Sequence, residues 1–327
     1  SGLEANTGCA QPFAHIHEEA AAAGWLEPAE KQQLTALEAA ADRAGLSWRQ
    51  LGDDLDAVAL CLNCPAKVQL DASAVVALTD IVARLPKDGD KEVTRDKGQR
   101  WAWAGQIFGN QSQAAYRAMC SLFLSSRRAW LFDGYPDSGN WKVFDATLAS
   151  KHLQDAGFNT TLSDTPQQND RAWRLRTAWP IEAGFIAVNS KGGADEFNVE
   201  PGQLRPGDIP FLTIPSIVYF VHSFSAAVPG ERSTVAGRWF ERGAYAYLGS
   251  TQEPFLPAFV PTPTLCVRLA NTFPWGVAVR PDNTSPAWKL ATFGDPLLTF
   301  GPPVTRSDKP LPLKNARDLT DNRKSVV

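Results

Sequence analysis

The sequence predicts an α/β domain of three layers, in which helices cover both faces of a mostly parallel β-sheet. Short runs of β-branched and aromatic residues alternate with segments of helical periodicity through most of the chain. Such alternation is typical of a parallel sheet whose crossover connections are helices. The 327 residues are 44% hydrophobic and 20% charged, which is enough apolar material for a sizeable core.

Residues 1–98 are predicted to form a smaller, partial α/β unit. Apolar residues recur at helical spacing over 27–45 and 71–86, which predicts two helices. Between them, the apolar run 56–65 predicts a buried strand. The segment 87–98 is charged and rich in turn residues, so it is the predicted linker to the next domain.

Residues 99–303 are predicted to form the main α/β domain, and residues 304–327 a polar tail. The predicted strands of this domain are 128–134, 158–164, 183–193, 216–223, 244–250 and 288–296. The predicted helices are 110–126, 141–157, 233–243 and 262–273. Ligands of such sheets bind beyond the carboxyl ends of the strands, so the loops there are the expected site.

Composition excludes some functions. The net charge of −3 gives no electrostatic reason to expect nucleic acid or an anionic membrane as a partner. No run of 18 apolar residues is present, so no membrane span is expected. We also expect no cofactor. Five scattered cysteines do not make a disulfide framework. The chain starts with Ser1, which predicts a processed or trimmed terminus.

Three stretches resemble the gingipain-type, caspase-like cysteine peptidases, and the match covers residues 127–303. They are "FIAVNSKGGADEF" at 185–197, the segment 215–250 that ends in "RGAYAYLGS", and the segment 253–298 that ends in "FGDPLL". The last two endings look most like bacterial relatives within that family. The resemblance implies a caspase-like sheet and an extracytoplasmic or secreted location, with a cytoplasmic location left open.

The resemblance also implies a catalytic His after the third strand of the unit and a Cys after the fourth. Here the third strand leads into Asn189, Ser190 and Lys191, and the fourth ends in His222 and Ser223. We place Ser223 at the nucleophile position and Ser190 near the general-base position, each to within one residue. Both members of the dyad are therefore replaced, and the cysteine peptidase site is predicted to be degenerate.

A serine needs an adjacent base to act as a nucleophile. If the strand continues through His222 and Ser223, their side chains point to opposite faces, although a sharp turn would relax this. His152 lies well inside the predicted helix 141–157, which places it away from the strand ends. Asp195 and Glu196 are carboxylates, which activate a hydroxyl poorly.

The strand ends are expected to form a small polar cleft that binds a ligand or peptide. Its predicted residues are Asn189, Ser190, Lys191, Ser223, Ser225 and Glu253. The proline-rich, aromatic loop 250–263 follows the fifth strand and is predicted to form either a wall of this cleft or a lid on the core.

Three short motifs are candidate metal or redox sites, but ordinary structure explains each of them better. They are Asp133 with Asp137, Cys61 with Cys64, and His15 with His17. The two aspartates lie in the expected site region and are weak candidates for Ca²⁺, but Asp and Gly also have turn roles there. The cysteine and histidine pairs lack further ligands at metal spacing.

The favoured interpretation is a non-catalytic, caspase-like domain that binds a protein or peptide or serves as an assembly module. One alternative is a hydrolase that uses Ser223, alone in this chain or with a dyad completed by another chain. Another is a structural piece of a larger processed extracellular protein. Detectable peptidase activity that Ser223→Ala removes would contradict the first interpretation.

Overall fold

The computed structural model describes residues 57–60, 64–69, 75–84, 100, 102–121, 126–135, 139–164, 166–281 and 287–300. Several sequence predictions fall outside these residues. They are the helix 27–45, the linker 87–98, the tail 304–327, and the side chains of His15, His17, Cys61 and Asp137. Within the described residues, no helix is both long and apolar enough to cross a membrane.

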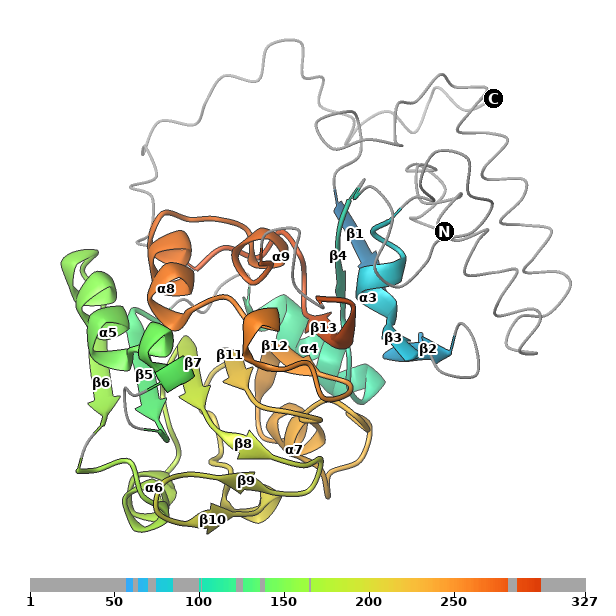
Figure 1. The fold of residues 1–327 in the computed structure, drawn as a ribbon. Helices are drawn as coiled ribbons and strands as arrows, with labels where there is room; N and C mark the ends of the chain where they lie inside the picture. The colour runs from blue at the N-terminus through green and yellow to red at the C-terminus, as the bar shows by residue number, and fades with distance from the viewer. Residues whose placement is uncertain are drawn as a thin grey trace, which may run out of the picture.

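An eight-stranded sheet forms the centre of the molecule and confirms the predicted α/β fold (Figure 1). Its spatial order is β1-β4-β13-β12-β11-β7-β5-β6. The bounds are Ala57–Leu60 for β1, Trp103–Gln106 for β4, Arg128–Asp133 for β5, Asn159–Ser163 for β6, Phe185–Asn189 for β7, Ser216–Val221 for β11, Ala244–Ser250 for β12 and Leu290–Phe293 for β13. Strands β12, β11, β7, β5 and β6 are parallel, whereas β13 is antiparallel to β12.

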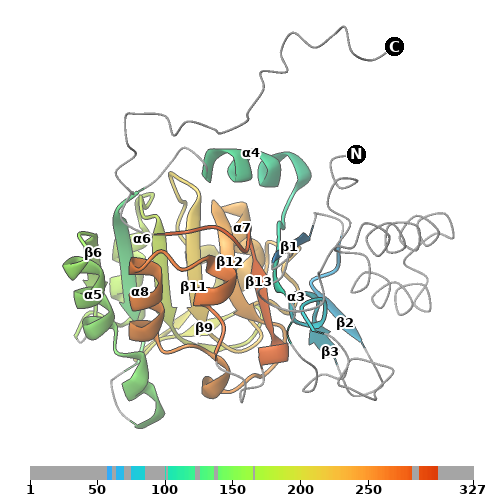
Figure 2. The ribbon, with the colours of Figure 1, turned by 90° about the horizontal axis from the view of Figure 1, so that it is seen from above.

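Helices cover both faces of the sheet, as Figure 2 shows from above. One face packs against α5 (Ala146–Asp155), α8 (Thr262–Ala270) and α9 (Trp275–Ala278). The other packs against α6 (Asp170–Thr177) and α7 (Val235–Glu241). Strand residues alternate between the two cores, so Tyr219 and Val221 face the first and Val218 and Phe220 the second. This two-sided burial explains why β7, β11 and β12 are apolar except for one polar residue at an end of each strand.

Within the predicted helix over 71–86, the structure describes residues 75–84, and only part of these is helical. Val75–Ala77 is strand β3, which pairs antiparallel with β2 (Lys67–Gln69), and only Leu78–Ile81 forms a helix, α3. A short apolar run such as "VVAL" fits both a buried strand and a helix, so periodicity alone did not distinguish them. Strand β1 pairs with β4, so residues from the predicted N-terminal unit join the same sheet as the main domain.

Several elements differ in their ends from the sequence prediction. The predicted helix 141–157 is divided into a 3-10 turn, η3 (Gly139–Phe144), and α5, because the Asp145 side chain caps α5 by accepting from Leu148 N. The predicted strand 183–193 stops at Asn189. The chain then enters a three-stranded antiparallel sheet of β8 (Lys191–Gly192), β9 (Phe197–Asn198) and β10 (Gln203–Leu204).

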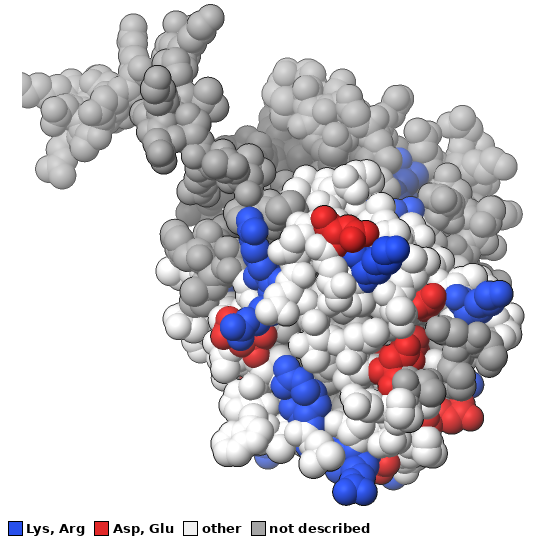
Figure 3. Space-filling view, turned by 90° about the vertical axis from the view of Figure 1, so that its left-hand side faces the viewer, with Lys and Arg blue, Asp and Glu red and all other residues white. Residues whose placement is uncertain are grey.

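The remaining helices are short or lie over one end of the sheet. Helix α4 (Gln111–Ser121) follows β4, and its Arg117 donates to the carbonyls of Phe240 and Glu241 at the end of α7. Three further 3-10 turns are η4 (Pro206–Asp208), η5 (Leu256–Ala258) and η6 (Ala287–Lys289). On the face formed at the left of Figure 1, near α5 and β6, basic and acidic side chains are interspersed (Figure 3).

A buried charge cluster ties distant segments together at the β13 side of the sheet. The carboxylate of Asp80 is 1% exposed and contacts three guanidinium groups. Its oxygens lie 2.8 Å from Arg84 Nε, 3.2 Å from Arg100 Nη2 and 3.3 Å from Arg280 Nη1. Arg280 follows α9, so this contact joins residues 200 positions apart in the sequence.

Candidate functional site

The carboxyl ends of β5, β7 and β11 are level with one another. Asn189 is the register partner of both Asp133 on β5 and Val221 on β11. The next residues along β7 and β11, Ser190 and His222, are therefore neighbours on the same face of the sheet. This register brings a hydroxyl and an imidazole together at the edge where parallel sheets place their ligands.

Ser190 and His222 form a directly hydrogen-bonded pair. Ser190 Oγ lies 2.9 Å from His222 Nδ1, and His222 Nε2 lies 2.8 Å from the carbonyl oxygen of Gly193. A carbonyl only accepts, so in the neutral ring Nε2 carries the proton and donates to Gly193. Nδ1 then accepts the hydroxyl proton of Ser190, which leaves the imidazole set as a base toward that hydroxyl.

Burial keeps this imidazole neutral. His222 is 1% exposed, and desolvation lowers its pKa to about 4. The backbone carbonyls of Gly193 and Glu196 and the charge of Glu253 act in the opposite direction without overcoming the burial. At neutral pH the ring is therefore unprotonated and free to accept.

Gly192 is needed for the ring to lie where it does. A Cβ on Gly192 would stand 2.8 Å from His222 Cε1 and 2.7 Å from the carbonyl oxygen of Glu196. The residue also has φ of 145°, a conformation that side chains rarely adopt. On the other side, Ser250 Oγ donates to the carbonyl oxygen of His222 at 2.7 Å and holds the backbone at the end of β11.

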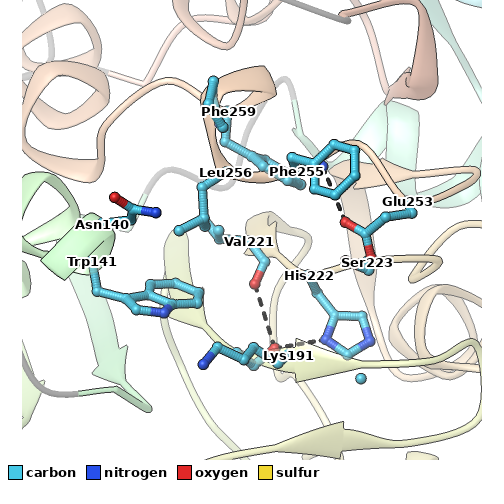
Figure 4. Close-up of a pocket in the computed structure, with 13 residues that line it drawn as sticks. Asn140, Trp141, Lys191, Val221, His222, Ser223, Glu253, Phe255, Leu256 and Phe259 are labelled. Carbon is cyan, nitrogen blue, oxygen red and sulfur yellow. Dashed lines mark hydrogen bonds between the residues drawn. The ribbon is translucent and has the colours of Figure 1, made fainter.

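A cleft of about 450 Å³ opens over this pair. It is built from the segments that follow β5, β7, β11 and β12, which supply Trp141, Ser190, His222 and Phe255 among others. In Figure 4, Trp141 lies on one side and Phe255 with Glu253 on the other. The predicted proline-rich loop 250–263 therefore supplies a wall of the cleft.

Lys191 is the only Lys or Arg among the described residues that line the cleft. Its Nζ lies 4.1 Å from the ring centre of Tyr135 and 5.5 Å from that of Trp141, and the two rings are stacked on each other. Opposite it, the Glu253 carboxylate accepts from Phe255 N at 3.0 Å. The cleft thus carries a cation on an aromatic platform at one side and a carboxylate at the other.

One residue that lines the cleft, and one that follows a lining residue in the chain, have strained backbones. Phe224 and Phe255 have φ of 58° and 60°, in the left-handed region that residues other than glycine seldom occupy. Phe224 directly follows Ser223, and Phe255 lines the cleft with 66% of its surface exposed. Residues held in such conformations cluster at functional sites in proteins.

The structure brings four of the six predicted cleft residues together. Ser190, Lys191, Ser223 and Glu253 line the cleft. Asn189 does not line it, because its side chain is buried and donates to Asp133 and to the carbonyl oxygen of Phe144. Ser225 is fully buried behind the strand ends, where its Oγ accepts from Ser250 N.

The buried carboxylate of Asp133 accepts hydrogen bonds within the protein, which indicates a structural role. Its carboxylate is 1% exposed and accepts from Asn189 Nδ2 at 3.0 Å and from the backbone N–H groups of Tyr135 and Ala146. Among the described residues, no group of three or more His, Cys, Asp or Glu side chains could hold a metal ion.

The other candidate bases lie elsewhere. His152 is on α5 and does not line the cleft, and Asp195 is 73% exposed in an ion pair with Arg205. The Glu196 carboxylate accepts a hydrogen bond from Gln203 Nε2, which belongs to β10 of the small sheet.

The Ser190–His222 pair was missed from the sequence because its two members come from different strands. Alternation along a single strand separates the side chains of His222 and Ser223, which are adjacent in the chain, and identifies no partner for Ser190. The usable signal was the register: both β7 and β11 are five- or six-residue apolar runs, and aligning their last residues puts Ser190 opposite His222.

Neither the known protein families nor the curated proteins include a sequence match to this chain. Among solved structures, the Arg-specific cysteine proteinase gingipain R aligns with a TM-score of 0.53 and 11% identity, over 77% of this chain and 66% of that one. The chain thus spans just under two thirds of the gingipain R chain. A second structure, described as a protease, aligns with a TM-score of 0.46 and 11% identity over 75% and 64%. The likeness to gingipain R shows that this chain has a caspase-like α/β fold.

Proposed function

We propose that this chain is a peptide-binding domain, and that the cleft above Ser190 and His222 receives an extended segment of another protein. The observation that carries the proposal is the position of β8. It is the edge strand of the small sheet, and its two residues, Lys191 and Gly192, line the cleft. An extended peptide can add to such an edge by main-chain hydrogen bonds while side-chain pockets supply specificity.

The walls of the cleft suit side chains of such a peptide. Trp141 and Phe255 offer aromatic surface on opposite sides, and Leu256 and Phe259 lie between them (Figure 4). Aromatic residues carry much of the energy at protein interfaces. Lys191 and Glu253 add one charge of each sign, which favours recognition of a mixed peptide rather than a polyanion.

The residues described in the cleft do not favour cysteine peptidase chemistry there. Among the described residues that line it there is no cysteine. Cys266 lies in α8 with no exposed surface, and burial raises the pKa of its thiol, which disfavours a thiolate. The alternative hydrolase needs an imidazole beside Ser223. His222 is its neighbour in the chain, but the imidazole of His222 bonds to Ser190 instead. An extracytoplasmic location and a place in a larger assembly stay predictions.

Binding can be tested by fluorescence anisotropy with a library of labelled extended peptides. Trp141→Ala and Phe255→Ala are each expected to weaken the best peptide about tenfold, which corresponds to about 1.4 kcal/mol. Trp179→Ala is the matched control, because Trp179 is 78% exposed and does not line the cleft. N-methylation of the peptide backbone at alternate positions should also abolish binding. Equal losses in all three variants, or insensitivity to N-methylation, would contradict the proposal.

A further inference from the structure

We infer that Ser190 is a nucleophile activated by His222, and that it accepts an acyl group from an ester bound in the cleft. This goes beyond peptide binding and rests on the proposed function only for access of the acyl donor to the cleft. Serine nucleophiles are recognised by a base within hydrogen-bond reach and a third group that orients the base. Here these are His222 Nδ1 at 2.9 Å and the carbonyl oxygen of Gly193 at 2.8 Å.

The direction of each hydrogen bond fits proton transfer. Ser190 Oγ–H donates to Nδ1, so attack of Oγ on a carbonyl carbon can deliver that proton to the ring as the C–O bond forms. The tetrahedral species then collapses, the bond from carbon to the leaving oxygen breaks, and Nδ1–H protonates that oxygen. In the second half a water attacks the acyl carbon, its proton passes to Nδ1, and Ser190 regains its hydrogen as the acid leaves.

The imidazolium formed during attack would be held by groups already in place. Its Nε2–H keeps its bond to the Gly193 carbonyl, and the negative charge of Glu253 at the cleft favours the protonated ring. No water or side-chain rearrangement is required at this nitrogen. The arrangement gives the ring a fixed orientation, which is the main requirement for a general base.

Other buried serines in the molecule differ from Ser190 in what they face. Ser216 Oγ donates to the Ala183 carbonyl and Ser250 Oγ to the His222 carbonyl, and neither lines the cleft. Those hydroxyls satisfy backbone groups of the core. Ser190 Oγ also lies 3.5 Å from the Val221 carbonyl, but its shorter contact, 2.9 Å, is to the imidazole. Among the described residues, Ser190 is the buried serine that both bonds an imidazole and borders the cavity.

The chemistry of the pair favours esters over amides. Burial lowers the pKa of His222 to about 4, so the ring is a weak base at neutral pH. A weak base gives little driving force for removing the hydroxyl proton, and a good leaving group is needed to compensate. The acyl donor class is therefore an activated carboxylic ester, whereas peptide bonds in the same cleft are expected to be retained.

The test uses the full chain with p-nitrophenyl acetate and with a fluorophosphonate probe. Intact mass is expected to show one adduct, and peptide mapping should place it on Ser190. Ser190→Ala should abolish it, and His222→Gln should slow labelling at least 100-fold, within the range that a general base contributes. Ser112→Ala is the matched control, because Ser112 is exposed on α4 and does not line the cleft.

Peptide anisotropy on the same samples separates the two proposals. No adduct, an adduct mapped to Ser223, or labelling that His222→Gln leaves unchanged would overturn the inference about Ser190, while intact peptide binding would leave the proposed function standing. If the unaltered protein binds no peptide, the proposed function is rejected whatever the probe shows. Mapping on the unaltered protein localises the adduct, so the result does not depend on a variant that folds poorly.

Discussion

Two polar clusters of this molecule are each built around a side chain that is 1% exposed, Asp80 in one and His222 in the other, and they differ in what they contact. Both oxygens of Asp80 are occupied by guanidinium groups of Arg84, Arg100 and Arg280, which join the start and the end of the described chain. The Ser190–His222 pair is neutral and borders a cleft of about 450 Å³. The difference teaches that burial of a polar group does not by itself mark a functional site. A functional polar group also needs access to a ligand and a partner that can take or give a proton.

The largest predicted effect on stability is that of Asp80→Asn in the charged cluster. Removing one partner of a buried ion pair leaves uncompensated charge, so we expect a loss of about 3–5 kcal/mol in the free energy of unfolding, measured with denaturant. Burial alone would raise the pKa of Asp80, but the three arginines outweigh it and lower that pKa. The contribution is therefore full above an ordinary carboxyl pKa of about 4 and is lost as pH falls below it.

Glu182→Gln is the control for that experiment. Glu182 forms an ion pair with Arg128 at 3.4 Å, and both side chains are at least 50% exposed. Such surface pairs contribute about 0–1 kcal/mol, so this variant should unfold almost like the original protein. An Asp80 variant as stable as the Glu182 variant would mean that the cluster is not structural.

The second prediction concerns Gly192→Ala at the other cluster. The new Cβ would approach His222 Cε1 and the Glu196 carbonyl closely, at a φ that alanine rarely adopts. We expect a loss of about 1–3 kcal/mol in stability and at least a tenfold slower acylation of Ser190, because the imidazole must move. Gly230→Ala is the matched change, since no atom lies within 4 Å of its added Cβ. Equal labelling rates in the two variants would contradict the role given to Gly192.

The fold was largely predictable, and the exceptions have a physical reason. Long buried runs such as 128–134 and 244–250 became β5 and β12 almost residue for residue, because two-sided burial requires continuous apolar sequence. Strand β4, "WAGQ", has only four residues and no β-branched side chain, so its single tryptophan is only a weak strand signal. Local sequence likewise does not encode that β13 runs antiparallel to β12.

The location of the candidate site was predictable from the sequence, but the hydrogen bond between Ser190 and His222 was not. The strand ends and the loop after β12 were expected to form the cleft, and Ser190, Lys191, Ser223 and Glu253 do line it. The Ser190–His222 bond depends on the register between two strands that lie about 30 residues apart in the sequence. A one-residue shift would have placed Ser223 opposite Ser190, and only the alignment of the last residues of the two runs favours the observed register.

A third prediction uses pH to sharpen the contrast between a charged and a neutral cluster. The folded-state pKa of His222, about 4, lies below the value of about 6.5 expected when unfolded. The unfolded chain therefore binds a proton first as pH falls, and stability drops between these two values. From pH 7 to pH 5 we expect a loss of about 2 kcal/mol that His222→Gln lacks.

Unfolding of the two proteins at both pH values measures this difference directly. The groups that face the ring are Ser190, the carbonyls of Gly193 and Glu196, and the carboxylate of Glu253. Glu253→Gln removes the one charged group among them and should lower the pKa of His222 further, so that the loss of stability continues to lower pH. Identical pH dependence in the original protein and His222→Gln would show that the imidazole is not held neutral.

The smallest expected effect on stability belongs to Lys191→Met, which keeps the apolar stem and removes the charge. The exposed ammonium lies over the rings of the Tyr135–Trp141 stack, where a cation–π contact contributes about 0.5–1 kcal/mol. Ligand binding should respond more strongly than stability. In the unaltered protein a peptide with an acidic side chain should bind about 5–10-fold more tightly than its amide counterpart, a preference that added salt weakens. Lys191→Met should bind both peptides alike at every salt concentration. If Lys191→Met weakens the binding of both peptides equally, the charge of Lys191 has a structural role, as that of Asp80 does. The cleft would then have no cation that selects its ligand among the described residues.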